Sequence, residues 1–126
     1  MAGKIIADQI QSTTAGTLDT KYVVDGSAKA WVSFDNASTA TIEESLNISN
    51  IVDFAAGETQ VNLTNNMTNA NYCIPASAGR TTSGGSPGAQ WIYGPASSRW
   101  QHETMANGGS YMDADNNYSA ALGDLA

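Results

Sequence analysis

Residues 28–35 read AKAWVSFD, a stretch in which the side chains alternate with a period of two. Successive side chains of a β-strand point to opposite faces, so this period favours a strand with one buried face. Elsewhere, no window of about eleven residues keeps the apolar spacing of an amphipathic helix. The pattern therefore predicts an all-β chain. Its two sets of positions are Ala28, Ala30, Val32 and Phe34 on the core face, and Lys29, Trp31, Ser33 and Asp35 on the other.

Residues 40–64 continue the strand pattern in two steps. In the first step Glu44 interrupts an otherwise apolar face, unless a β-bulge changes its direction. In the second step a turn at residues 55–58 joins two short apolar alternations, which predicts a hairpin. The in-phase apolar positions are Ile42, Leu46 and Ile48 in the first step, and Val52, Phe54, Val61 and Leu63 in the second.

The second half of the chain predicts a further edge strand, a hairpin and a last strand. Pro75 cannot donate a hydrogen bond to a sheet, so the strand around it lies at an edge or ends there. Residues 79–90 are rich in Gly, Ser and Thr and predict a long surface loop. The aromatic-rich residues 91–104 predict a hairpin, and alternation of Tyr118 with Ala120 and Leu122 predicts the last strand.

About six to eight short strands separated by turn signals are typical of an antiparallel β-sandwich, here jelly-roll-like. We assign this sandwich to residues 22–126, and an extended N-terminal arm to residues 1–21. The arm has Ile5, Ile6 and Ile10 among polar residues, so we expect it to pair with a neighbouring subunit or to form a plain first strand.

The charge distribution argues against nucleic acids as partners. The net charge is −7, and residues 30–79 contain no Lys or Arg, so no basic stripe is present to neutralise nucleic-acid phosphates. Only 13% of the residues are charged, which favours a surface covered by copies of the chain or by partners, or simply a neutral surface. No apolar run predicts a signal peptide or a membrane span, so we expect synthesis in a cytoplasm-like compartment. The single cysteine, Cys73, is predicted to be a small buried residue.

Catalytic and metal-binding motifs match poorly. The sequence Gly84-Gly85-Ser86-Pro87-Gly88 matches the G-x-S-x-G motif of a nucleophile elbow. In that motif the residue after the serine donates its backbone N–H to the oxyanion hole, and Pro87 has no N–H. His102 is the only histidine and is expected to be a hydrogen-bonded strand or surface residue. An Asx-rich run has the spacing of a calcium loop, from Asp113 through Asp115 and Asn117 to Asp124, but Tyr118 replaces the required glycine. We therefore expect no enzyme activity, cofactor or metal.

Several short motifs together resemble small virion and tail-fibre-type proteins of tailed bacteriophages. They are Ala-Lys-Ala-Trp-Val at residues 28–32, Ile-x-Asp at 51–53, Met-x-x-Ala-Asn-Tyr at 67–72 and Gly-Asp-Leu-Ala at 123–126. The resemblance covers most of residues 22–78 and the last few residues. It implies a non-enzymatic virion component with an oligomeric β-domain, and it supplies no catalytic residues. The chain lacks a long repetitive shaft, so it is expected to be an adaptor, a fibre tip or a head-decorating protein.

Two functions follow as hypotheses. The first is a virion structural protein that self-associates, with a trimer favoured, and docks on capsid or tail proteins. The alternative is a receptor- or glycan-binding module that uses Trp91, Trp100 and residues 79–90 against the host surface. The candidate interface residues are Ile5, Ile6, Ile10, Trp31, Trp91, Tyr93 and Trp100. Among them, Trp31 is the first place to look for an oligomer interface, because it points away from the predicted core.

Overall fold

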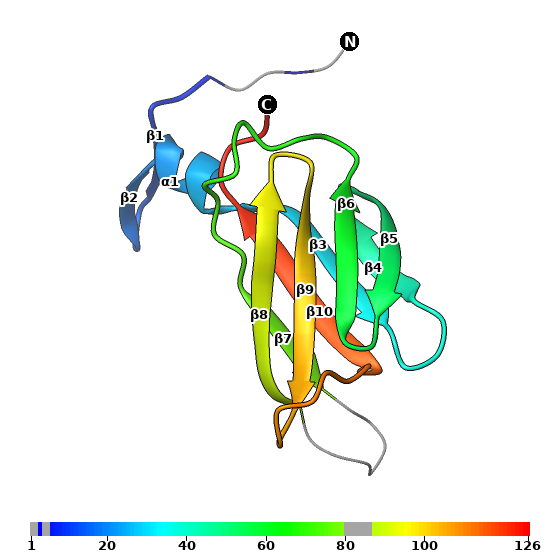
Figure 1. Cartoon of the computed structure of the whole chain (residues 1–126). Helices are drawn as coiled ribbons and strands as arrows, with labels where there is room; N and C mark the ends of the chain where they lie inside the picture. The colour runs from blue at the N-terminus through cyan, green and yellow to red at the C-terminus, as the bar shows by residue number, and fades with distance from the viewer. Residues whose placement is uncertain (1–2, 4–5, 80–86) are drawn as a thin grey trace.

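The computed structural model describes residue 3 and residues 6–79 and 87–126. Two four-stranded antiparallel sheets lie one behind the other (Figure 1), which confirms the predicted all-β sandwich. The first sheet has the order β4-β3-β10-β7 and the second has the order β5-β6-β9-β8. The first contains β3 (Ala28–Asp35), β4 (Thr41–Leu46), β7 (Ala76–Gly79) and β10 (Asn116–Leu122). The second contains β5 (Ile48–Ala55), β6 (Glu58–Leu63), β8 (Pro87–Ala96) and β9 (Arg99–Ala106).

The hydrophobic core lies between the two sheets. The alternation in β3 buries Ala30, Val32 and Phe34 as predicted, although Ala28 at the start of the strand is exposed. From the opposite sheet, Trp100 on β9 is the largest fully buried side chain. Burial of each large apolar side chain stabilises the fold by about 1.5–3 kcal/mol. The remaining buried members of this cluster are Val61, Leu63, Met67 and Ala121.

The last strand, β10, is confirmed, but its core face is mostly polar. Asn117 and Ser119 are buried, while the intervening Tyr118 is exposed. Burial of polar groups costs little when they are hydrogen-bonded, and here the partners come from both sheets. Asn117 Nδ2 donates to the carbonyl oxygens of Ala114 at 2.7 Å and of Phe34 on β3 at 3.3 Å, and Trp100 Nε1 on β9 donates to Ser119 Oγ at 3.2 Å. The apolar alternation of the last strand therefore belongs to its outer face.

The apolar positions Ile42, Leu46 and Ile48 were expected in one run, but they belong to two strands. Asn47 has a positive φ of 59°, and there the chain leaves β4 in the first sheet and enters β5 in the second. The predicted hairpin is confirmed by the pairing of β5 with β6, and Val61 and Leu63 are buried. Phe54, in contrast, is 54% exposed, because two register shifts in β5 change which side chains face the core.

Two further expectations are corrected. Cys73 is exposed rather than buried, because its neighbours Tyr72 and Ile74 pack against the core and the alternation directs Cys73 to the other side. The predicted loop over residues 79–90 is too long, since Gly79 ends β7 and Pro87 begins β8. Pro87 is tolerated there because β8 is an edge strand and Pro87 is its first residue. The rest of that loop lies outside the described residues.

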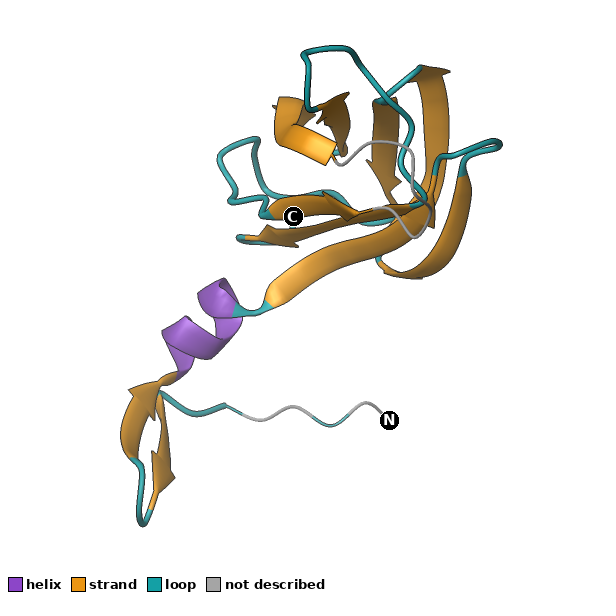
Figure 2. Cartoon of the chain, turned by 90° about the horizontal axis from the view of Figure 1, so that it is seen from below, coloured by secondary structure: helices purple, strands orange, loops and turns teal. Residues whose placement is uncertain are grey.

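The segment before β3 projects from the sandwich (Figure 2). It consists of a hairpin, β1 (Gln9–Ser12) with β2 (Gly16–Asp19), and a helix, α1 (Thr20–Gly26). We call residues 6–27 the arm. The sandwich begins at Ala28, six residues later than the predicted start at residue 22. Over the described part of the chain, no helix has the length and apolar character needed to cross a bilayer.

Candidate functional site

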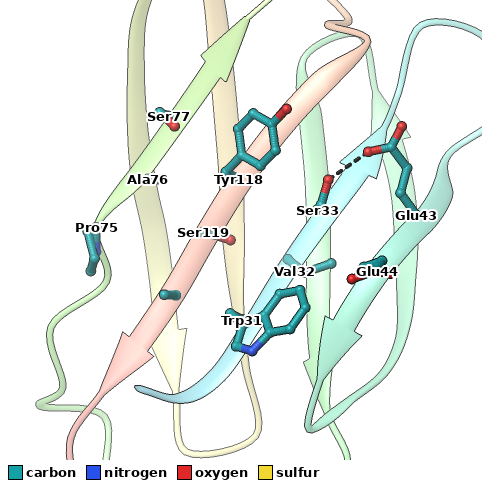
Figure 3. A pocket seen from close by; sticks show the side chains of 11 residues that line it. Trp31, Val32, Ser33, Glu43, Glu44, Pro75, Ala76, Ser77, Tyr118 and Ser119 are labelled. Carbon is teal, nitrogen blue, oxygen red and sulfur yellow. Dashed lines mark hydrogen bonds between the residues drawn. The ribbon is translucent and has the colours of Figure 1, made fainter. Parts of the chain in front are cut away.

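A hollow of about 740 Å³ lies on the outer face of the first sheet, away from the core (Figure 3). We call it the trough. Aromatic rings, carboxylates, a proline and a hydroxyl surround it, and small side chains form its floor. The surrounding residues are Trp31, Tyr118, Glu43, Glu44, Pro75 and Ser77, and the floor residues are Ser33, Ala76 and Ala120.

Strand alternation and register place the aromatic rings of the trough. The outer face of β3 presents Trp31, and the outer face of β10 presents Tyr118, which is 45% exposed. Ala120 pairs with Trp31 and Tyr118 pairs with Ser33, so the two rings are diagonal neighbours on adjacent strands. Figure 3 shows the two rings on the neighbouring strands β10 and β3. The small Ala120, which is the cross-strand partner of Trp31, also lines the trough.

A β-bulge in β4 places two consecutive carboxylates beside these rings. Ser33 pairs with Glu44 and Phe34 pairs with Ile42, so Glu43 is the extra residue. Without the bulge, neighbouring residues would point to opposite faces; with it, both Glu43 and Glu44 are exposed and line the trough. The hydroxyl of Ser33 donates to Glu43 Oε2 at 2.6 Å, which holds this carboxylate over the sheet.

The predicted interface residues do not gather at one place. Trp31 lines the trough, while Trp91 and Tyr93 are exposed on β8 in the other sheet. There the indole N–H of Trp91 donates to Glu103 Oε2, and its ring lies edge-on to Tyr111 at 6.4 Å between centroids. The negative charge of Glu103 raises the pKa of Tyr111. Trp91 is therefore partly held by its neighbours.

The remaining predicted interface residues lie in three different settings. Ile6 and Ile10 are exposed on the arm, at 83% and 52%, and Ile5 lies outside the described residues. The assignment of Trp100 to an interface is wrong, because its side chain is fully buried between the sheets. The alternative receptor site that combined Trp91, Trp100 and residues 79–90 therefore loses its central residue, and residues 80–86 of that loop are outside the described part.

His102 is a strand residue, as expected, but it is buried. It is 1% exposed and lies edge-on to Phe34 at 5.5 Å between ring centroids. Burial lowers its pKa to about 4, although a hydrogen bond to the backbone of Ser77 acts in the opposite direction. Its Nε2 has no hydrogen-bond partner among the described residues. An imidazole between two sheets cannot contact a substrate in this conformation.

The burial of His102 predicts a loss of stability in acid. The unfolded imidazole takes up its proton near pH 6.5, whereas the folded one takes it up only near pH 4. Stability is therefore fully present above pH 6.5 and falls between pH 6.5 and 4, by about 3 kcal/mol at about 1.4 kcal/mol per pH unit. Urea unfolding of wild type and His102→Gln at several pH values isolates this contribution from that of the carboxylates. The free-energy difference between the two proteins should shrink as the pH falls; a constant difference contradicts the assignment.

The residues of the calcium-like spacing are separated. Asp113 precedes β10 and accepts a hydrogen bond from Gly57 N at 2.7 Å, whereas Asp124 follows the same strand. Asn117 faces the core between them. Among the described residues no group of three metal-ligating side chains comes together. Pro87 and Gly88 of the nucleophile-elbow match belong to β8, and the rest of that match lies outside the described residues.

Sequence reasoning did not identify Tyr118, Glu43 and Glu44 as members of one site. Tyr118 was available from the alternation of the last strand, but its outward direction depends on buried polar partners for Asn117 and Ser119. Glu44 was available as an interruption of an apolar face, and the bulge proposed for that interruption is present, with Glu43 as its extra residue. What joins them to Trp31 is the strand order β4-β3-β10.

No protein-family model, curated protein or solved structure matches this chain.

Proposed function

We propose that this chain is a non-enzymatic structural protein of a bacteriophage particle, which self-associates and docks on other particle proteins through the arm. The bacteriophage setting rests on the sequence resemblance described above. The assembly role rests on one observation in the structure: the arm is built from elements that bury none of their apolar side chains. Tail component and capsid decoration protein remain the two forms of this proposal.

The arm exposes an unusual share of large apolar side chains. In the hairpin, Ile10 and Leu18 are paired across β1 and β2, and they are 52% and 46% exposed. No residue of α1 is buried, although it carries three large apolar side chains in succession. These are Tyr22, Val23 and Val24, which are 58%, 41% and 54% exposed. Contiguous exposed apolar residues are typical of protein-interaction surfaces.

Isolated elements of this size are marginally stable. A helix of seven residues is well below the length at which a helix is stable alone in water, and a two-stranded hairpin needs further packing. The hydrogen bonds that join the arm's two elements are local, such as Thr20 N to the carbonyl oxygen of Asp8 at 2.9 Å. Packing of the apolar side chains against copies of the arm, or against another protein, would supply the missing stability. A symmetric trimer is the arrangement we favour.

Replacement of Val24 by aspartate should break this assembly. A charge among the apolar side chains of the helix would have to be buried without a partner in the assembly, which costs several kcal/mol. Wild type should sediment as an oligomer, with about 39 kDa for a trimer, three times 13.1 kDa. Val24→Asp should sediment as a folded monomer. Phe54→Asp is a matched control, because Phe54 has the same exposed fraction, 54%, but lies on the sandwich.

Sedimentation velocity over a range of concentrations gives the readout, and circular dichroism verifies that each variant keeps its β structure. A wild-type protein that stays monomeric and has no affinity for other particle proteins contradicts the proposal. So does a Val24→Asp variant that assembles like wild type.

A further inference from the structure

We infer that the trough is a binding site for a saccharide chain built from neutral or amino sugars. The inference is independent of the arm and of the proposed assembly role. It rests on the chemistry that converges on one face of the first sheet: two neighbouring aromatic rings, two carboxylates, hydroxyl groups and a floor of small side chains.

The aromatic rings suit the apolar faces of sugar rings. The face of an aromatic ring carries partial negative charge, and it attracts the weakly positive C–H groups that one side of a pyranose presents. Trp31 and Tyr118 lie as diagonal neighbours on the outer face of the sheet, where Tyr118 is 45% exposed and Trp31 is half-buried. Between and beside them, Ala120 and Ala76 leave the space in which a sugar ring would lie.

The polar groups of the trough suit hydroxyl and amino groups. A carboxylate only accepts hydrogen bonds, so Glu43 and Glu44 require a ligand that donates them. Sugar hydroxyls are such donors, and an ammonium group would add charge attraction. Glu43 is already oriented by Ser33 at 2.6 Å, while its remaining acceptor positions stay available over the sheet.

Charge excludes acidic ligands. Both charged residues that line the trough, Glu43 and Glu44, are negative, and the whole chain has a net charge of −7. Nucleic acids, uronic acid chains and phosphorylated ligands would be repelled. A neutral or amino sugar chain has the complementary character.

Other copies of this chain fit the trough less well. Two troughs placed face to face would bring four carboxylates together without a cation. The arm of a second copy is no better, because residues 6–27 contain three aspartates and a single lysine. An extended peptide would pair with an edge strand such as β4, which has no neighbouring strand on its outer side, rather than with the face of the sheet.

Calorimetric titration of the full chain tests the site with four tetrasaccharides: those of glucose, N-acetylglucosamine, glucosamine and galacturonic acid. We expect at least one of the first three to bind and the acidic one not to bind. Trp31→Ala and Tyr118→Ala should each weaken binding by about tenfold or more. Trp91→Ala is the matched control, since Trp91 is an outer-face tryptophan of the other sheet, and it should leave affinity unchanged.

Two more variants separate the ligand chemistry from changes in the fold. Ala120→Gln keeps both rings but fills the floor, and it should also abolish binding. Glu44→Gln removes a charge and should weaken glucosamine binding more than glucose binding. Circular dichroism and urea unfolding verify each fold. The inference would be falsified if only the acidic tetrasaccharide binds, or if none of the other three sugars binds. It would also fail if Trp91→Ala weakens binding as much as Trp31→Ala does.

Discussion

Trp100→Ala is expected to lower the free energy of unfolding by about 3–5 kcal/mol, the range for removal of a large aromatic side chain from a core. Trp100 is fully buried, and its ring lies edge-on to Tyr72 at 6.4 Å between centroids. Its N–H also links the two sheets through Ser119. The loss is therefore a cavity between the sheets together with an unpaired hydroxyl. Urea unfolding monitored by circular dichroism gives the value.

Two variants keep this prediction testable if Trp100→Ala does not fold. Trp100→Phe retains most of the ring volume but loses the N–H, so we expect a smaller loss of about 1–3 kcal/mol. Trp91→Ala removes the same side chain from a site that is 38% exposed, and we expect a loss of about 1 kcal/mol. Equal losses in Trp91→Ala and Trp100→Ala would contradict the placement of Trp100 in the core. Loss of a binding activity in Trp100→Ala would reflect unfolding.

Gly57→Ala is expected to cost about 3–5 kcal/mol, because two separate effects add. Gly57 has a φ of 73°, which residues with a side chain rarely adopt, and it forms the turn between β5 and β6. An added Cβ would overlap the carbonyl oxygen of Thr104 and would lie 2.8 Å from the backbone nitrogen of Met112. Backbone atoms cannot rotate away as a side chain can, so the turn or its neighbours must move.

Gly109→Ala separates these two effects. Gly109 also has a positive φ, 86°, but no atom lies within 4 Å of its added Cβ. This variant should show only the conformational cost, about 1 kcal/mol. The difference between the two free energies of unfolding therefore measures the close approach of the β5–β6 turn to β9. Similar losses of unfolding free energy in both variants would mean that the β5–β6 turn shifts at little cost, which contradicts the prediction.

The hydrogen bonds around Gly57 raise the expected cost further. Its N–H donates to Asp113 Oδ1 at 2.7 Å, and its carbonyl oxygen accepts from Thr104 N at 2.9 Å. Asp113 Oδ1 also accepts from Asn36 Nδ2 at 3.2 Å, so movement of the turn would disturb a link between the two sheets. Asp113→Ala, measured in the same way, should lose about 1–3 kcal/mol.

The buried face of a strand can be predicted from the sequence where the apolar side chains of that strand alone determine it. In β3 the small and apolar core positions alternate with others, and Val32 and Phe34 are buried as the period requires. In β10 the apolar alternation predicts a strand but not its buried face. Asn117 is buried there because it donates hydrogen bonds to the carbonyl oxygens of Ala114, just before the strand, and of Phe34 on β3. Such partners exist only after the sheets have paired.

The trough was predictable in parts but not as a unit. Trp31 was expected to point away from the core, and it does. Its neighbours come from a bulge at Glu43 and from a strand that follows some eighty residues later, at Tyr118. Sequence spacing gives no information on which strands become neighbours. The sequence alone therefore could not predict that the aromatic residues and the glutamates of the trough lie together. The exposure of Cys73 was missed, although its neighbours Tyr72 and Ile74 take the core-facing positions and strand alternation directs Cys73 outward.

The exposed cysteine allows the copies of this chain in an assembly to be counted. Cys73 is the only cysteine in the chain, and its main chain is fixed by two hydrogen bonds with Leu122, at 3.0 and 2.9 Å. A thiol-reactive fluorophore therefore attaches once per chain at an ordered position. In a single assembly, the number of photobleaching steps equals the number of labelled copies, and the location of the dye on an intact particle distinguishes head from tail.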